Sequence, residues 1–104
     1  MARRIADTFA LSVDELGAVF GGTAQDATRW LARGFPADRV GKAVIILEIA
    51  KLLTRYLRTD RIGVVVRKPA ATYGGHAMLE MVEAGEHNVV LDSVRASFDF
   101  TSTA

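Results

Sequence analysis

The sequence predicts an all-α protein: a small helical bundle with a helix-turn-helix in its N-terminal part and short helices in its C-terminal part. Three observations support this prediction. Apolar residues recur at helical spacing, Ser and Thr residues suited to helix caps precede the first apolar runs, and glycines end several of these runs. The chain has 104 residues, 50% of them apolar and 24% charged, which is the size and composition of one globular domain.

The first two helices are expected near the N-terminus. Residues 3–10 can form a short opening helix, in which Ile5 and Phe9 lie one turn apart on the same face. Ser12 and Glu15 then have the spacing of a capping box, in which the Ser hydroxyl accepts from the third helical amide and the carboxylate reaches back. The helix that this box starts is expected to bury Val13, Leu16, Val19 and Phe20.

A second capping box, Thr23 with Asp26, starts the next helix, which ends at Gly34. Two capped helices joined by a short glycine turn have the form of a helix-turn-helix. Gln and Arg side chains read base edges, and Thr can reach a phosphate or a thymine methyl. An ordinary helical hairpin with a solvated face is the alternative. The candidate DNA-binding residues lie on the exposed face of the second helix: Gln25, Thr28, Arg29 and Arg33.

The pattern from residue 37 to residue 58 predicts one long helix after the break at Phe35-Pro36. Its apolar arc covers most of the circumference, so the helix must be buried on two sides. One side can face the protein's own core and the other a second copy of the chain, since two-fold homodimers are the commonest assembly. The alternative is a central helix that the other helices wrap. The apolar residues are Val40, Ala43, Val44, Ile45, Ile46, Leu47, Ile49, Ala50, Leu52, Leu53, Tyr56 and Leu57.

Residues 60–66 can be interpreted in two ways. Three consecutive Val residues favour a strand, but a short helix capped at Thr59 or Asp60 would also bury them. Pro69 ends either element, because the residue before a proline leaves the helical region. The rest of the chain is expected to form a loop at 73–75, a short helix at 77–84 and a last helix at 86–98.

Several classes of protein are excluded or disfavoured. The absence of cysteine excludes disulfides and thiolate metal sites and fits a cytoplasmic location. The basic start is followed by polar residues rather than the apolar core of a signal peptide. The longest apolar stretch, Val40 to Leu57, is no membrane span because it is interrupted by Lys42, Glu48, Lys51 and Arg55.

The sequence carries no motif for catalysis. His76 and His87 lack a third nitrogen or sulfur ligand, and Gly74-Gly75-His76 lacks the Lys-Ser/Thr of a phosphate-binding loop. No Ser/His/Asp order stands out, and Glu80 with Glu83 is better interpreted as a solvated acidic patch than as an acid/base pair. We therefore expect a protein that is not an enzyme and needs no metal or cofactor.

Charge is divided unevenly along the chain. Residues 1–68 hold 12 Lys/Arg against 7 Asp/Glu, a net charge of +5. Residues 69–104 hold one Arg against 5 Asp/Glu, a net charge of −4. This division suggests a polyanion partner for the first part and a different partner, such as a basic protein, for the second.

From about Leu11 to Ser97 the chain resembles the Xre/MbcA/ParS-type antitoxins. The N-terminal half shares the pattern of Xre-like helix-turn-helix proteins, Leu16…Thr23…Arg29-Trp30-Leu31…Gly34. The C-terminal half is similar to the family's series of Arg-x-Pro, Gly, short apolar helix and Gly, here Arg67…Pro69…Gly75…Leu79…Met81…Gly85…Val89. The position after His76, often Pro in this family, is Ala77 here. The resemblance also favours a helix for residues 60–66.

The resemblance implies an antitoxin of a type II toxin–antitoxin system. Members of the family typically pair with RES-domain toxins, which consume NAD. The implied protein blocks the active site of its toxin and represses its own operon by binding operator DNA. Residues 1–65 would be the helix-turn-helix and dimerisation region, and residues 66–104 the toxin-binding region. A stand-alone helix-turn-helix transcriptional regulator, with a C-terminal half that serves only for dimerisation, is the alternative.

The candidate toxin-binding residues come from the C-terminal region. Exposed aromatic and Met side chains are common anchors of protein interfaces. Structural roles are the alternative: the glycine pair would supply permissive backbone, Arg67 would cap a helix or pair with a carboxylate, and Tyr73 would be part of the core. The candidates are Arg67, Tyr73, Gly75, His76, Met78, Glu80, Phe98 and Phe100.

Overall fold

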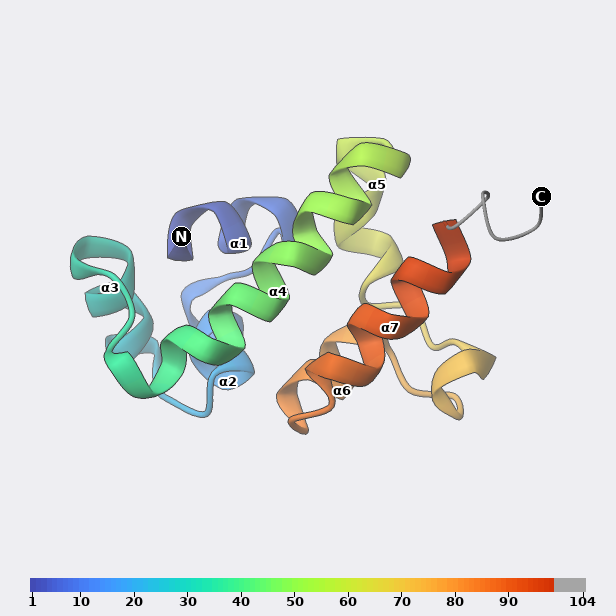
Figure 1. Ribbon diagram of the computed structural model, residues 1–104. Coiled ribbons are helices and arrows are strands. Elements are labelled where there is room, and N and C mark those ends of the chain that lie inside the picture. Colours follow the sequence, from blue (N-terminus) through green and yellow to red (C-terminus); the bar gives the residue numbers. More distant parts are fainter. Residues whose placement is uncertain (99–104) are drawn as a thin grey trace.

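A computed structural model describes residues 1–98 of the chain. These residues form seven α-helices and one 3-10 helix, and their only β-type pairing is an isolated bridge between Ala70 and His76. The predicted all-α class is therefore confirmed (Figure 1). The elements are α1 (Ala2–Phe9), α2 (Val13–Val19), α3 (Ala24–Arg33), α4 (Ala37–Tyr56), α5 (Thr59–Val65), η1 (Ala71–Tyr73), α6 (Met78–Glu83) and α7 (His87–Phe98).

The long helix α4 organises the fold. Helices α1, α2 and α3 gather around its N-terminal half and α5 follows its C-terminal end, while α7, with α6 beside it, runs alongside α4 (Figure 1). Helix α7 runs parallel to α4: Lys42 is close enough to His87 to affect its ionisation, and the Tyr56 and Phe98 rings stack at 4.5 Å. One core cluster includes residues from all seven α-helices. The regions 1–65 and 66–104 thus share a core, and their division is a hypothesis about function.

The other helices cover part of the surface of α4, as the alternative of a wrapped central helix expects. Ala43, Ile46, Ile49, Ala50 and Leu53 are buried. Val40 and Val44, however, are 37% and 49% exposed on the remaining face. The prediction of a homodimer through this face stays open.

Both predicted capping boxes are present. Ser12 Oγ accepts from the Glu15 amide at 3.1 Å, and Thr23 Oγ1 accepts from the Asp26 amide at 3.1 Å. Each carboxylate accepts from the amide of its cap residue in return. The predicted burial of Val13 is wrong, because this side chain is 42% exposed. It is the first residue of α2, and the buried residues of this helix, Leu16, Gly17 and Val19, all lie after its first turn begins.

Helices α2 and α3 approach closely at Gly17. A Cβ atom at this position would lie 2.4 Å from the carbonyl oxygen of Thr23, a distance that side chains do not tolerate. The absence of a side chain therefore lets the start of α3 pack against α2. Gly41, on the exposed face of α4, has no heavy atom within 4 Å of the corresponding position.

We expect Gly17→Ala to lower the free energy of unfolding by roughly 1–3 kcal/mol, because the added methyl overpacks a backbone contact. Gly41→Ala is the matched control, expected to raise it by about 0.5–1 kcal/mol through helix propensity. Urea unfolding followed by circular dichroism measures both changes. Equal effects of the two substitutions would contradict this account of Gly17.

The ambiguous segment after α4 is helical, so the interpretation of residues 60–66 as a strand is wrong. The helical geometry places the apolar side chains of this segment on two sides. Ile62 and Val66 are fully buried, whereas Val64 and Val65 are 59% and 37% exposed. A single turn of 3-10 helix, Ala71–Tyr73, leads into the loop expected at residues 73–75. None of the helices within residues 1–98 is both long and apolar enough to cross a membrane.

Candidate DNA and partner interfaces

Helix α3 exposes all four candidate DNA-binding side chains, as predicted: Gln25, Thr28, Arg29 and Arg33. Thr28 donates to the Ala24 carbonyl at 3.0 Å, and Arg29 pairs with Asp26 of the capping box while its side chain stays 67% exposed. The face is therefore polar and accessible. DNA contact itself stays a prediction.

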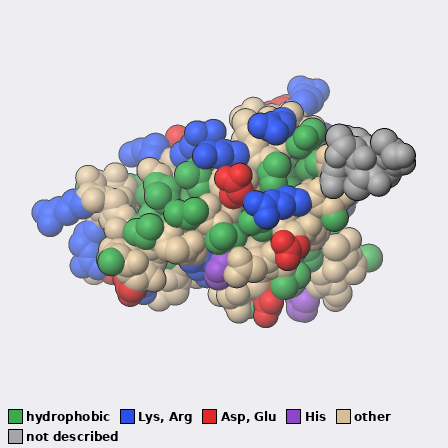
Figure 2. Space-filling model, in the orientation of Figure 1, with side chains coloured by type: hydrophobic (Ala, Val, Ile, Leu, Met, Phe, Trp, Pro, Cys, Tyr) green, Lys and Arg blue, Asp and Glu red, His purple; other side chains and the backbone are tan. Residues whose placement is uncertain are grey.

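The end of the molecule that carries α3 is more basic than α3 alone. Helix α1 contacts α3, and its Arg3 and Arg4 are exposed. Figure 2 shows Lys and Arg side chains gathered at this end. This contribution could not be predicted from the sequence, because no local pattern places residues 3 and 4 beside the helix-turn-helix.

An aromatic cluster fixes α3 relative to α4. The Phe20 ring lies 5.8 Å from Trp30 and 4.5 Å from Phe35. The Arg39 guanidinium lies 5.5 Å from the centre of the Trp30 ring, and its Nε donates to the Phe20 carbonyl at 3.0 Å. Lys42, one turn further along α4, donates to the Val19 carbonyl at 2.6 Å. The orientation of α3 is thus set by packing and by hydrogen bonds to the end of α2.

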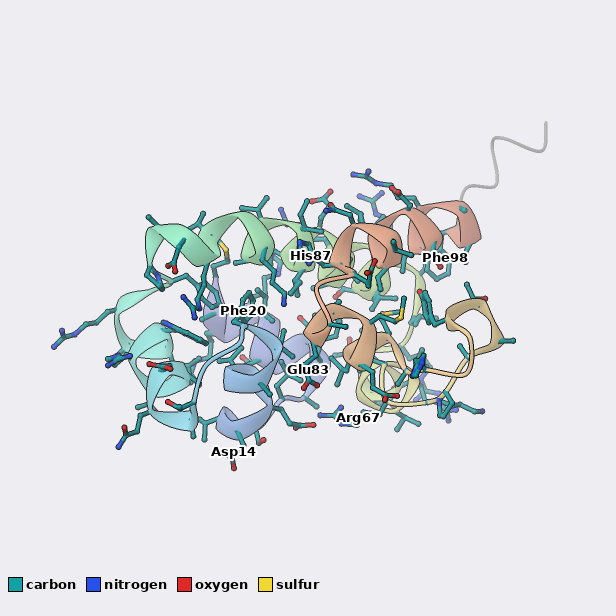
Figure 3. The ribbon with its side chains drawn as sticks, turned by 90° about the horizontal axis from the view of Figure 1, so that it is seen from below. Asp14, Phe20, Arg67, Glu83, His87 and Phe98 are labelled. Carbon is teal, nitrogen blue, oxygen red and sulfur yellow. The ribbon has the colours of Figure 1, made fainter. Side chains whose placement is uncertain are left out.

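Arg67 links three helices (Figure 3). Its Nη1 donates to the carbonyls of Phe9 at 2.9 Å and Gly63 at 2.7 Å, and its Nη2 donates to Ala10 at 2.8 Å. The same Nη2 lies 2.8 Å from Glu15 Oε1. The guanidinium therefore ties the end of α1 and the start of α2 to α5. For Arg67, the structure shows pairing with a carboxylate, which was the structural alternative to toxin binding proposed from the sequence.

The Glu15 carboxylate belongs to both the capping box and the Arg67 link. Its pKa is lowered, first by the hydrogen bond from the Ser12 amide and then by the hydrogen bond and charge of Arg67. Because the folded-state pKa lies below the ordinary value of 4.5, this stabilisation is fully present above that pH. It is lost as the pH falls through the folded-state pKa.

Two other candidate partner-binding side chains are largely internal. Tyr73 and Met78 are each 9% exposed, and the Tyr73 hydroxyl is 3.0 Å from Ser93 Oγ on α7. Gly75 has a φ of +89°, a backbone conformation that favours glycine. This agrees with the structural role proposed for Gly75 as the alternative to toxin binding. These three residues shape the turn between α5 and α6.

The remaining candidates lie on α6, at its start and at the end of α7. His76 is exposed, with Nδ1 3.8 Å from Glu80 Oε2. Glu80 Oε1 accepts from the Ala77 amide at 2.8 Å, a bond that a proline at position 77 could not donate. Phe98 is half-buried, and Phe100 lies outside the described residues. Of the candidate side chains that are described, His76, Glu80 and Arg67 are exposed, and the Arg67 guanidinium is already engaged in the link between helices.

A comparison with solved structures identifies the fold. No family model matches the sequence, and no curated protein matches it either. One matching structure is a chain of the crystal structure of the M. tuberculosis MbcT-MbcA toxin-antitoxin complex, with a TM-score of 0.76. The two chains share a fold. The match covers 91% of this chain and 87% of that chain at 18% sequence identity, so the likeness extends across both halves of the molecule.

We expect Arg67→Ala to lower the free energy of unfolding by about 2–3 kcal/mol, since it leaves carbonyls at the end of α1 without their charged donor. Glu15→Gln should keep the capping box but reduce the loss of stability below about pH 4.5, because the titrating partner is gone. Urea unfolding at several pH values measures both effects. The range from about pH 3 to pH 7 spans roughly the titration of a carboxyl group.

Asp14→Asn, a change at an exposed neighbouring residue in the same turn, is the control. If Arg67→Ala unfolds at the same urea concentration as the wild-type chain, the link among α1, α2 and α5 has no energetic importance.

Proposed function

We propose that this chain is the antitoxin of a type II toxin–antitoxin pair and that it binds and neutralises a toxin of the RES-domain class. The observation that carries the proposal is the fold match over 91% of the chain to a chain from a toxin-antitoxin complex. The series Arg67…Pro69…Gly75…Gly85 supports it from the sequence, through its resemblance to the Xre/MbcA/ParS-type antitoxins.

The proposed mechanism requires no chemistry from this chain. An antitoxin of this kind covers the entrance to the toxin's active site, so neutralisation is stoichiometric and ends when the complex dissociates. The exposed residues of the C-terminal region, including His76 and Glu80, are available for such a contact. The chain is therefore proposed to be a binding protein and not an enzyme.

Co-expression with the gene encoded beside it tests the antitoxin proposal. We expect the neighbouring product to stop growth when expressed alone, to be neutralised by this chain, and to purify with it in fixed proportion. Leu16→Asp, which places a charge at a fully buried position, is the control. This variant is expected to unfold and therefore to stop rescuing growth. A neighbour that is harmless alone, or toxic despite the folded chain, would overturn the proposal.

We further propose that the helix-turn-helix binds operator DNA and that a homodimer places two copies of α3 on it. The four exposed arginines at one end of the molecule, Arg3, Arg4, Arg29 and Arg33, support DNA binding. The exposed Val40 and Val44 support a dimer contact through α4. In the alternative function, a stand-alone regulator, the same DNA contact would occur without a toxin partner.

The double substitution Arg29→Ala with Arg33→Ala is expected to weaken operator binding by more than about tenfold and to reduce the salt slope by roughly two. The reason is the loss of two phosphate or base contacts. Arg61→Ala with Arg95→Ala, a change of equal charge at exposed positions on α5 and α7, is the control. Gel-shift titrations at several salt concentrations give both quantities. If the two double variants bind equally, α3 is not the recognition helix.

A further inference from the structure

His87 is the first residue of α7, at the end of this helix that lies beside α4 and follows α6 (Figure 3). Its ring nitrogen Nδ1 is buried and has no hydrogen-bond partner among the described residues. A neutral imidazole carries a proton on one nitrogen, whereas the charged imidazolium carries one on both. Protonation of His87 would therefore place an N–H group where no acceptor meets it, which is unfavourable for a buried donor.

The ammonium group of Lys42 is the charge on α4 that acts on this ring. Its Nζ donates to the Val19 carbonyl at 2.6 Å and lies 5.8 Å from the centre of the Phe20 ring. The ammonium is thus held at the end of α2 by a backbone bond and a ring contact. It cannot turn away from a second cation on His87 without losing both.

The other charged groups of this cluster come from three places. Glu86 directly precedes α7 and favours the charged form of His87, whereas Glu83 of α6 and Arg39 of α4 act on Lys42. Both carboxylates are exposed, so water screens their attraction. The start of a helix also disfavours a cation. In sum the pKa of His87 is lowered, first by burial and then by the charge of Lys42.

We propose that His87 makes the packing of α7 against α4 sensitive to protons: as the pH falls below neutrality the ring becomes charged, and the first turns of α7 loosen from α4. Above neutrality the ring is uncharged and the contact is complete. This sensitivity does not depend on the antitoxin function, so the isolated chain is sufficient to test it.

The direction of the pH dependence follows from the lowered pKa. Because the pKa of His87 in the packed state lies below the ordinary value of 6.5, the loosened state binds the proton more readily. The stabilisation is fully present above about pH 6.5 and is lost as the pH falls through the pKa of the packed state. Carboxyl groups titrate around pH 4, so a change between about pH 7.5 and pH 5.5 reports on histidine.

An NMR titration of the full chain follows the His87 ring without any substitution. We expect its midpoint to lie below 6.5, and Lys42→Met, which removes the neighbouring charge, to raise it. A midpoint at or above 6.5 in the wild-type chain overturns the proposal. A midpoint that the folded Lys42→Met variant leaves unchanged overturns the part assigned to Lys42.

Amide hydrogen exchange measures the loosening itself. The Val90 amide reports on the first turn of α7, because it donates to the Glu86 carbonyl at 3.1 Å. After correction for the intrinsic effect of pH on exchange, we expect this amide to lose protection severalfold between about pH 7.5 and pH 5.5 in the wild-type chain.

His87→Gln, which is neutral at every pH, should keep its protection over the same range. His76→Gln removes the exposed histidine and is the matched control, expected to respond to pH as the wild-type chain does. If protection of the Val90 amide in the wild-type chain does not change with pH, α7 is not proton-sensitive. If folded His87→Gln loses protection as much as the wild-type chain, another group is responsible and the role of His87 is wrong.

Discussion

The burial of α4 on several sides is the constraint on which the rest of the structure depends. A helix that is apolar over most of its circumference would expose a large apolar surface to water, so other segments of the chain must pack against it. Helix α1 covers one side and α7 another, and the parallel course of α7 requires a connection that runs back along the molecule. Helices α5 and α6, with the η1 turn between them, form that connection.

Local features of the fold could be predicted from the sequence, because they depend on residues three or four positions apart. The two capping boxes and the exposed face of α3 are examples. Features that depend on distant residues could not be predicted. The close approach at Gly17 and the hydrogen bonds of Arg67 join segments that only the folded chain brings together.

The residues that carry the family resemblance in the C-terminal half are mostly structural. Arg67 ties helices together, Gly75 occupies a left-handed turn, and Leu79 is part of the core. A motif of this kind preserves the shape of a surface without forming the surface itself. Candidate contacts taken from the motif therefore include internal residues such as Tyr73, whereas α5, which lies before the motif, presents the most exposed apolar side chain.

The pairing of α4 with α7 has a consequence for the protein while it is being made. Because α7 is the last described helix of the chain, α4 leaves the ribosome well before the helix that covers one of its sides. Until then Ile49 and Leu53 lie on a side of α4 without its native cover. Between the completion of α4 and the emergence of α7, a nascent chain of this protein consequently presents an incompletely covered apolar helix to chaperones and proteases, and the core closes only when α7 has emerged.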